Sequence, residues 1–511
     1  MSIRTFAAID VGSFELTMKI FEFPAKKSMR EIDCIRRRLD LGTDTYSDGK
    51  ISNENLDELC RTLKEFSDIM NSYKVEAYRA YGTSAIRETE NTTIVQDQIT
   101  QRTGIRVDVL SNSEQRFLAY KSLASQGESF RNIIEDKTAI LDIGGGSIQL
   151  SLFDNDTLVS TQNLQLGVLR TQEFLNQFEA SGVKAGYVME EMAMAQLSAY
   201  KKLYLKDREI RNLIVVDDYV SPCLVRMNGS KSIMELSDFS GFWDQLHAGS
   251  ITQVAQEMGI TEERVPLVLI SATLIKKIAG LMGAQNIWAP GVTLCDGIAY
   301  EYAEGVRLLK GEHDFEKDIV ACATNISKRY MGSKKRSETL ERITTTIFDS
   351  MKKVHGLGKR ERLYLRLAAI LHDCGKYVSL VNIGVTSYQI IMATEIIGLS
   401  HIEREIVANI VRFNHSKFVY YDQQTSFNRL DRESYLIVAK LTAILRLANG
   451  LDRSHKQKLM GLKAALKDNR LVLTIDTQED ITLEKGYFKV RGKFFKEVFS
   501  VEPVLRQRKN L

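Results

Sequence analysis

Two segments of the chain share a pattern of strand, tight turn and strand, and this repeat constrains the fold more than any other feature. The first segment runs from Thr5 to Ile20 and the second from Lys137 to Leu152. In each, a short apolar strand ends at an aspartate, a glycine turn follows, and apolar residues then alternate as in a second strand. Because both hairpins open stretches of comparable length, they predict a duplicated lobe.

Helix-like and strand-like stretches alternate after each hairpin. The expected helices cover residues 52–73, 114–125 and 187–205, and the expected strands cover 75–81, 105–110, 213–216 and 265–270. Such alternation predicts α/β lobes. We therefore expect lobe I over residues 1–125 and lobe II over residues 126–310.

The pattern changes beyond the second lobe. Apolar residues keep a helical spacing over residues 311–455, which predicts an all-helical domain. Residues 471–475 and 488–491 alternate with period two, and a helix is expected over 493–499. The segment 456–511 is therefore predicted to be a small α+β domain.

The two hairpin turns have the chemistry of a phosphate site. Without Cβ atoms, Gly144, Gly145 and Gly146 can expose successive N–H groups that accept phosphate oxygens. The strand-end carboxylates of Asp10 and Asp142 can hold a hydrated Mg²⁺ that neutralises the same phosphates. A single Asp-x-Gly is more often a structural turn, but the duplication and the GGGS run favour a phosphate site. No Walker or dinucleotide loop is present in the sequence, because no Gly-Lys-Ser/Thr follows and a strand succeeds each turn.

Six motifs follow one another along the chain: Asp10-Val-Gly-Ser13, the segment from Gly82 to Asn91, the segment from Val109 to Gln115, the segment from Leu141 to Ser147, Ser271-Ala-Thr273 and Cys295-Asp-Gly297. Their order and spacing resemble the exopolyphosphatase / guanosine pentaphosphate phosphohydrolase (Ppx/GppA phosphatase) family. The resemblance implies two actin-like lobes of the sugar kinase/actin, ribonuclease H-like superfold. It also implies Mg²⁺ and a phosphate chain in the interlobe cleft, attack of water on the terminal phosphorus, and a homodimer.

The resemblance also assigns roles to individual residues. Asp10 and Asp142 fall on metal-associated positions, and the pair Glu114-Gln115 falls where the family carries two glutamates, the second of which is the expected base. The positions that fall on substrate contacts are Ser13, Arg87, Gly144, Gly145, Gly146, Ser147 and Thr273.

Three departures from the family pattern bear on activity. Phe14-Glu15 replaces Asn-Ser in the first turn, Gln149 replaces a metal-associated carboxylate, and Gln115 replaces the base. An amide cannot accept the proton of the attacking water, and a positioned base contributes about 10²- to 10⁴-fold. We therefore expect reduced but real hydrolysis in which Glu114 takes over as the base.

The helical segment resembles an HD-type metal phosphohydrolase domain through His372-Asp373 and the downstream Asp452. The match is incomplete, because Thr339 stands where an upstream histidine is expected and the middle histidine pair is missing. A metal site that loses several imidazoles loses affinity. We therefore expect a structural or partner-docking remnant in which these three residues are satisfied polar groups.

The composition limits the binding partners and the cellular location that we expect for the protein. A net charge of +4 does not suggest specific nucleic-acid binding, although basic residues crowd the segment 456–509 as a solvated surface or a polyanion contact. Six cysteines without a CxxC pair argue against zinc and disulfides and indicate the reducing cytoplasm. We find no apolar run of about 18 residues and expect no membrane span.

The leading function hypothesis is a Mg²⁺-dependent hydrolase that releases terminal phosphate from inorganic polyphosphate, with guanosine pentaphosphate as a second substrate. A catalytically impaired regulatory protein that binds polyphosphate or a nucleotide is the alternative, motivated by Gln115 and Gln149. A third hypothesis, an HD nucleotide phosphohydrolase, is disfavoured by the missing histidines.

Overall fold

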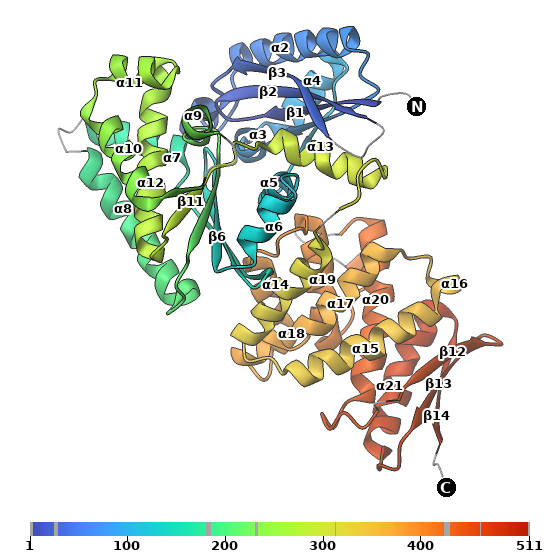
Figure 1. Ribbon diagram of the computed structural model, residues 1–511. Helices are drawn as coiled ribbons and strands as arrows, with labels where there is room; N and C mark the ends of the chain where they lie inside the picture. The colour runs from blue at the N-terminus through green and yellow to red at the C-terminus, as the bar shows by residue number, and fades with distance from the viewer. Residues whose placement is uncertain are drawn as a thin grey trace. The chain divides into compact units, whose positions relative to one another are not determined.

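The computed structural model describes residues 4–24, 29–179, 185–229, 233–311, 313–423, 430–459 and 461–508. The chain forms two compact units, Met1–Phe315 and Glu316–Leu511, and each is described by itself (Figure 1). The first unit contains two sheets and the second contains a helical bundle with one small sheet.

The first sheet has five strands in the order β3-β2-β1-β4-β5. The three strands that come first in the chain pair antiparallel, whereas β4 and β5 join parallel to β1. Asp10 stands near the end of β1, opposite Thr17 of β2. The strands are β1 Arg4–Val11, β2 Glu15–Phe23, β3 Arg30–Arg38, β4 Ala77–Gly82 and β5 Val107–Val109.

The second sheet repeats this topology. Its order is β10-β11-β9-β6-β7-β8, so that β8-β7-β6-β9-β11 matches the first sheet strand for strand. Asp142 stands at the end of β6 opposite Gln149 of β7, as Asp10 stands opposite Thr17. The duplicated α/β fold is confirmed. The strands are β6 Thr138–Ile143, β7 Ile148–Asp154, β8 Thr157–Leu164, β9 Asn212–Asp217, β10 Ile233–Glu235 and β11 Asn286–Trp288.

Helices cover both faces of the first sheet, because alternate side chains of β1 point to opposite sides. Ala7 and Ile9 pack into the core beneath α2 (Asn53–Ser72) and α4 (Thr92–Thr103). Phe6 and Ala8 face α5 (Asn112–Ala124) and α13 (Leu294–Gly305). The helix α13 therefore packs on the first sheet although it follows the second sheet in the chain (Figure 1). Shorter helices are α1 Leu41–Ser47, α3 Ser84–Glu88 and α6 Glu128–Ile134.

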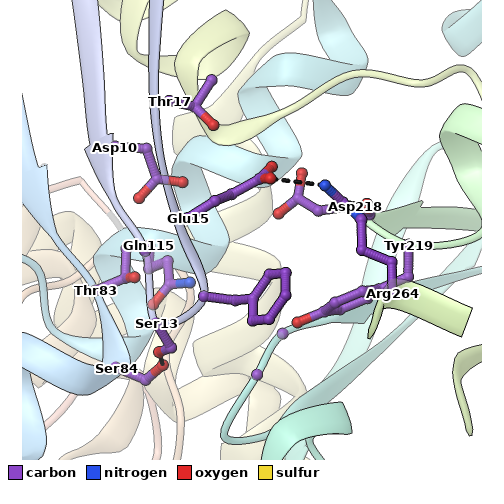
Figure 2. A pocket seen from close by; sticks show the side chains of 14 residues that line it. Asp10, Ser13, Glu15, Thr17, Thr83, Ser84, Gln115, Asp218, Tyr219 and Arg264 are labelled. Atoms are coloured by element: carbon purple, nitrogen blue, oxygen red, sulfur yellow. Dashed lines mark hydrogen bonds and ion pairs between the residues drawn. The ribbon is translucent and has the colours of Figure 1, made fainter. Parts of the chain in front are cut away.

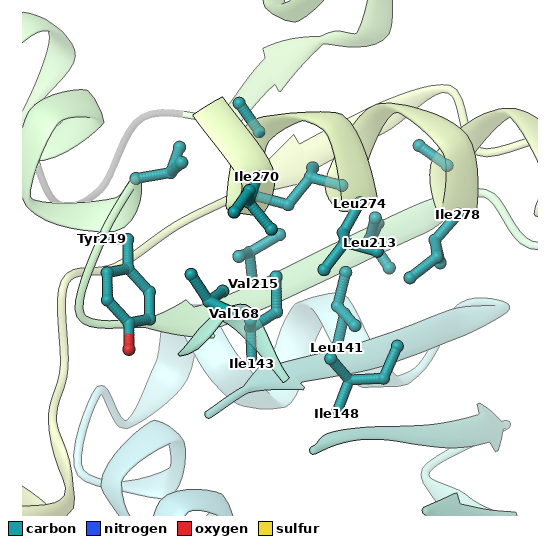
Figure 3. Packing of buried hydrophobic residues seen from close by; sticks show 14 of the residues in the cluster. Leu141, Ile143, Ile148, Val168, Leu213, Val215, Tyr219, Ile270, Leu274 and Ile278 are labelled. Atoms are coloured by element: carbon teal, nitrogen blue, oxygen red, sulfur yellow. The ribbon is translucent and has the colours of Figure 1, made fainter. Parts of the chain in front are cut away.

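The core of the second lobe lies between its sheet and the long helix α12 (Val265–Met282). Figure 3 shows Ile270, Leu274 and Ile278 of this helix packed over the β9 residues Leu213 and Val215. The other helices of the lobe are α7 Val168–Glu179, α8 Ala185–Tyr200, η1 Lys201–Leu205, α9 Ser221–Asn228, α10 Leu236–Ala248, α11 Ile251–Met258 and η2 Glu262–Arg264.

The strand predicted over residues 265–270 is wrong, because these residues form the first turns of α12. A continuous apolar run is compatible with a buried strand and with a buried helix. Pro266, at the first or second position of the helix, fits the fixed φ of a helix start. The helix is apolar on nearly all sides because it is buried between the sheet and neighbouring helices.

The second unit begins as a bundle in which α15, α17, α19 and α20 contact one another. A three-stranded sheet, in the order β12-β13-β14, follows with the helix α21. The helices are α14 Phe315–Arg329, α15 Lys334–Ser350, α16 Lys352–His355, α17 Lys359–Leu371, η3 Cys374–Tyr377, α18 Ile383–Ala393, α19 His401–His415, η4 Tyr421–Gln423, α20 Arg432–Leu451 and α21 Thr482–Phe499. The strands are β12 Lys463–Lys467, β13 Arg470–Asp476 and β14 Glu502–Arg508.

The strand predicted over residues 488–491 is also wrong, because these residues lie inside α21. A strand would place Phe488 and Val490 on the same face. Instead Phe488 is buried with Phe495 and Phe499 at helical spacing, whereas Val490 is 64% exposed. Four alternating residues were too short a pattern to distinguish the two structures.

Two helical stretches are long and apolar enough to cross a membrane, although the sequence was expected to contain no such run. They are Glu262–Met282 and Arg432–Leu451. Within each helix, the apolar stretch of 18 residues is largely buried inside the protein, to 67% in the first helix and to 83% in the second. This burial explains their apolar character as that of core helices.

The close packing of α13 on α5 generates a testable prediction. A Cβ atom at Gly297 would lie 1.9 Å from the carbonyl oxygen of Leu118 in α5. We expect Gly297→Ala to lower the free energy of unfolding by about 1–3 kcal/mol, because the helices cannot separate without disturbing the core. Urea unfolding followed by circular dichroism measures the change.

The matched control is Gly280→Ala in α12, where a Cβ atom would meet nothing within 4 Å. This change should stabilise the protein by about 0.5–1 kcal/mol through helix propensity. Equal effects of the two substitutions would contradict the packing described.

Candidate active site

Both glycine turns of the first unit line one cavity (Figure 2). The first turn contributes its backbone and side chains, and the second contributes two of its three glycines. Residues from the β4–α3 connection, from α5 and from the second lobe complete the wall. The lining residues are Asp10, Gly12, Ser13, Phe14, Glu15, Thr17, Thr83, Ser84, Gln115, Gly144, Gly145, Asp218, Tyr219 and Arg264.

The second turn has amides without a recorded acceptor, and it reaches the cavity through Gly144 and Gly145. The carbonyl oxygens of Gly144 and Gly145 accept hydrogen bonds from the N–H groups of Val168 and Arg170, at 3.0 and 3.1 Å. The Nε of Arg170 donates to the carbonyl of Gly146 at 2.9 Å. Among the described residues no acceptor is recorded for the N–H groups of residues 145–147. Consecutive amides left in this way form an anion-binding nest.

A close contact behind the second turn fixes its shape. A Cβ atom at Gly167 would lie 2.1 Å from the carbonyl carbon of Gly146. Only glycine allows the segment that begins α7 to approach the turn so closely. The amides of the turn are therefore oriented by the protein before any ligand binds, which lowers the cost of binding.

The first turn brings together three hydroxyl groups. The Ser13 hydroxyl lies 2.8 Å from that of Ser84 and 3.2 Å from the phenol of Tyr46. The carbonyl oxygen of Ser13 accepts a hydrogen bond from Gly42 at 2.7 Å. Because each hydroxyl can both donate and accept, the cluster can rearrange to donate to an anion in the cavity.

Asp10 offers a carboxylate oxygen to the cavity. Its Oδ1 is buried and has no hydrogen-bond partner among the described residues. Burial, followed by the nearby carboxylates of Asp218 and Glu15, raises the pKa of Asp10 well above its usual range. Figure 2 shows these three side chains directed toward the same part of the cavity. A bound cation would relieve the repulsion among them.

Asp142 has a different environment, because a guanidinium group is bound to it. Its Oδ1 lies 2.5 Å from Nη1 of Arg116, whose side chain is only 3% exposed. Burial raises the pKa of Asp142, and Arg116 holds back part of that rise. Asp142 is not among the residues that line the cavity.

The predicted catalytic pair splits between two environments. Gln115 lines the cavity, and its Oε1 accepts a hydrogen bond from Nη1 of Arg87 at 3.1 Å. The same nitrogen donates to the carbonyl of Leu110 at 2.8 Å, so Arg87 supports the wall of the cavity from behind. Glu114 instead accepts hydrogen bonds from the backbone and hydroxyl of Ser111, in the capping box that begins α5.

Other predicted positions lie away from the cavity wall. Thr273 is buried in α12, where it donates to the carbonyl of Leu269 and accepts from the indole of Trp243. Ser147 accepts a hydrogen bond from Arg116 on its hydroxyl, and Gly146 packs beside Tyr46. Gln149 is buried next to Ser151 of the same strand.

The first-turn departures, Phe14 and Glu15, are accommodated by arginines. Glu15 forms ion pairs with Arg264 at 2.7 Å and with Arg36 at 3.4 Å. The guanidinium of Arg264 also lies 5.9 Å from the centre of the Phe14 ring. The extra carboxylate is therefore neutralised within the wall and does not present an unpaired charge to an anion.

Asp218 is a cavity residue that the motif comparison did not reveal. It follows β9, and the preceding Asp217 holds the turn by accepting hydrogen bonds from the amides of Val220 and Ser221 and from the Ser271 hydroxyl. Burial, followed by the Glu15 carboxylate, raises the pKa of Asp218 to about 6. The available signal was its place after a buried strand, since ligands bind beyond the carboxyl ends of parallel strands.

Comparison with known proteins decides the family. Residues 20–304 match the model of the Ppx/GppA phosphatase family, and residues 320–488 match Ppx/GppA phosphatase, domain III. The chain belongs to the Ppx/GppA phosphatase family. The resemblance inferred from the motifs is thereby confirmed.

Two relatives and one solved structure illustrate this membership. The guanosine-5'-triphosphate,3'-diphosphate pyrophosphatase of Photobacterium profundum is 20% identical over 489 residues, which cover 92% of this chain and 91% of that protein. Exopolyphosphatase 1 of Mycobacterium tuberculosis is 28% identical over 169 residues, which cover 33% of this chain and 48% of that protein. A crystal structure of an exopolyphosphatase-like protein shares the fold, with 18% identity and a TM-score of 0.51 over 60% of this chain and 100% of that one.

The HD-type motif of this Ppx/GppA protein lies in a buried polar cluster of the helical unit. His372 donates from Nδ1 to the carbonyl of Ala369 at 2.8 Å, and its Nε2 lies 3.4 Å from Asp373. Among the described residues, Nε2 of His372, Oδ1 of Asp373 and Oδ2 of Asp452 have no hydrogen-bond partner. The expectation that these three residues are fully satisfied polar groups is therefore wrong.

A buried arginine, Arg336, stands among the HD-type residues. Its Nη1 lies 3.7 Å from Asp373, and its Nη2 donates to Asn449 at 2.9 Å. Its side chain is 4% exposed. No group of three or more histidine, cysteine or acidic residues placed to hold a metal is found in the part of the chain that the structure describes. Arg336 and Lys376, which lies 3.0 Å from Asp373, together offset the charge of that carboxylate.

This arrangement predicts a large effect of removing the arginine. We expect Arg336→Met to lower the free energy of unfolding by about 1–3 kcal/mol, because the buried Asn449 loses its donor and Asp373, which keeps Lys376 at 3.0 Å, loses a second cation. The exposed Arg470 of β13 is a matched control, and Arg470→Met should change stability by less than about 0.5 kcal/mol. Urea titration measures both. Unchanged stability of the Arg336 variant, or stoichiometric Mn, Fe or Zn in the purified protein, would contradict this description.

Proposed function

We propose that this member of the Ppx/GppA family hydrolyses terminal phosphoanhydride bonds of inorganic polyphosphate, or of guanosine pentaphosphate, in the cavity between its two glycine turns. The observation that carries the proposal is the convergence of both glycine turns on one cavity, where Gly145, whose amide has no recorded acceptor, lines the wall together with the Asp10 carboxylate. Amides and a carboxylate-bound cation are complementary to the charge of a phosphoryl group in its transition state.

The substrate phosphates are proposed to bind along the two turns. The N–H groups of residues 145–147 would donate to the oxygens of one phosphate, and the hydroxyls of Ser13 and Ser84 would donate to the same chain. Ser147 is placed to use its amide, because its hydroxyl already accepts a bond from Arg116. Arg87 would act on the phosphates through Gln115, since its guanidinium holds that side chain. Thr273 has no direct role in this scheme, because Trp243 and Leu269 occupy its hydroxyl.

The residues at Asp10 fit the Mg²⁺ ion that the family resemblance implies. An unpartnered carboxylate oxygen is a ligand that Mg²⁺ accepts, and this ion commonly uses one or two carboxylates together with substrate phosphates and waters. Bound there, Mg²⁺ would supply positive charge to the phosphate oxygens. Asp142, the second expected ligand, keeps only one oxygen without a partner, because Arg116 is bound to the other.

The attacking water requires a proton acceptor, and Asp218 is the carboxylate that the geometry favours. Gln115 lines the cavity but is an amide, and Glu114 is engaged in the capping box of α5. Glu15 lines the cavity but is held in ion pairs with two arginines. No ion pair of Asp218 is recorded among the described residues, and its position is fixed by Asp217 and by a hydrogen bond from Arg264 to its carbonyl. Asp218 would accept the proton as the water oxygen bonds to the terminal phosphorus and the bridging P–O bond breaks, so that orthophosphate forms and the shortened chain departs with the bridging oxygen.

A second hollow adjoins the cavity and supports an extended substrate. It shares Asp218, Tyr219 and Arg264 with the cavity and adds Arg36 and Arg226 to the wall. Arginine guanidinium groups bind phosphates well, so a chain with several phosphates could continue there. Homodimer formation and a cytoplasmic location stay predictions from the sequence.

The alternative function, a regulatory protein that binds polyphosphate or a nucleotide with little turnover, has two specific observations in its favour. An amide at Gln115 replaces the expected base, and Arg116 is bound to the carboxylate of Asp142. Neither feature removes the amides of the second turn, so binding would persist where hydrolysis is slow.

Phosphate release from polyphosphate in the presence of Mg²⁺ tests the proposal. We expect release by the wild-type protein that EDTA abolishes. Asp218→Asn should lower kcat by about 10²- to 10⁴-fold with little change in KM, because the proton acceptor is lost. Gln115→Glu in the Asp218→Asn background should recover much of that loss by restoring a base at the cavity wall.

The matched control is Glu114→Gln, which should change kcat by less than threefold, because Glu114 does not line the cavity. A large loss of kcat in Glu114→Gln, together with no loss of kcat in Asp218→Asn, would identify Glu114 as the base instead. Negligible release by the wild-type protein together with a strong gain in Gln115→Glu would favour the regulatory alternative.

A further inference from the structure

Arg116 is the best-defined charged group behind the second glycine turn. It extends from α5, whose start is fixed by the capping box of Ser111 and Glu114. Its Nη1 contacts Asp142 at 2.5 Å, and its Nη2 donates to the carbonyl and the hydroxyl of Ser147 at 2.9 and 3.0 Å. The guanidinium therefore connects the aspartate two residues before the glycine run to the serine directly after it.

The guanidinium also lies directly against the glycine run. A Cβ atom at Gly144 would lie 3.4 Å from Nη2 and 3.6 Å from Nη1 of Arg116. Arg116 is 4% exposed, so its charge is not screened by bulk water. A buried positive charge behind unbonded amides strengthens their attraction for an anion.

The two strand-end aspartates occupy equivalent positions in the two sheets, but the charged groups around them differ. Asp142 has an internal cation, whereas no ion pair of Asp10 is recorded among the described residues. A divalent cation is therefore favoured at Asp10 and is opposed by the guanidinium at Asp142.

We infer that Arg116 takes the place of a divalent cation at Asp142, so that the second glycine turn binds a phosphate group without a metal ion. The divalent cation of the cavity then belongs to Asp10. This inference rests on the proposed function only in that the cavity receives a phosphate chain, and it holds whether or not the chain is hydrolysed.

One observation could support the opposite assignment. Oδ2 of Asp142 is buried without a hydrogen-bond partner among the described residues, and a cation could bind there beside the guanidinium. In that case Asp142 would be a metal ligand as well as the partner of Arg116. The isosteric change Asp142→Asn separates the two assignments, because it keeps Arg116 and removes only the carboxylate charge.

The experiment measures the binding of inorganic tripolyphosphate to the full chain by calorimetry in EDTA. The wild-type protein should bind without metal. Asp142→Asn should bind as tightly or more tightly, because the charge of Arg116 is no longer offset. Arg116→Met should bind at least tenfold more weakly in EDTA, and added Mn²⁺ should recover part of this loss by binding to the freed Asp142 carboxylate.

Mn²⁺ binding followed by electron paramagnetic resonance gives the second measurement. Asp10→Asn should weaken Mn²⁺ binding at least tenfold, whereas Asp142→Asn should leave it within about twofold. Because Asp142→Asn keeps the size of the side chain, it serves as the deciding variant if Arg116→Met fails to fold.

Two results would overturn the inference. The first is tripolyphosphate binding by the wild-type protein that requires a metal, and the second is an equal loss of Mn²⁺ binding in Asp10→Asn and Asp142→Asn. Failure of the proposed function is recognised separately, since it would appear as metal-free binding of tripolyphosphate without phosphate release in Mg²⁺.

Discussion

The hydrogen bonds that hold the carbonyl groups of the second glycine turn are the interaction on which the site depends. Val168 and Arg170 donate hydrogen bonds to the carbonyls of Gly144, Gly145 and Gly146. The close approach of Gly167 leaves no room for the peptide groups of the turn to rotate. The amides that follow are thereby left for a ligand. A phosphate that binds them need not reorganise the backbone, which is the condition under which such dipoles stabilise a transition state most effectively.

Buried arginines are a second theme of this chain. Arg116 lies against Asp142 in the first unit, and Arg336 lies among Asp373 and Asn449 in the second. In both places a carboxylate at a position associated with metal in the family resemblance is compensated by a guanidinium. An internal cation is always present, does not depend on the supply of metal, and fixes the surrounding side chains through directed hydrogen bonds.

Much of the fold could be predicted because it follows from local patterns. The repeated hairpins around Asp10 and Asp142 predicted the duplicated sheets, and the helical spacing over 52–73 gave α2 within one residue at each end. The strand predicted over 265–270 failed because an apolar run does not distinguish a buried helix from a buried strand. The alternation over 488–491 failed because four residues cannot outweigh the longer helical period of α21.

The site was predictable in its backbone but not in its side-chain partners. The glycine run indicated the amide nest, since glycine spacing is a local signal. The pairing of Arg116 with Asp142 and the position of Asp218 at the cavity depend on tertiary packing between segments distant in sequence. The capping box of Ser111 and Glu114 is local, and its Ser-x-x-Glu spacing was a signal in the sequence. The comparison with a family motif gave residue types at positions, whereas the structure gives the direction of each side chain.

A crystal structure of the protein with a non-hydrolysable imidotriphosphate and Mg²⁺ would show whether the two aspartate-led glycine turns bind one phosphate chain. We expect a phosphate within hydrogen-bonding distance of the amides of residues 145–147, the cation beside Asp10, and the remaining phosphates along the first turn. A ligand bound outside this cavity, or one that contacts only one of the two turns, would contradict it.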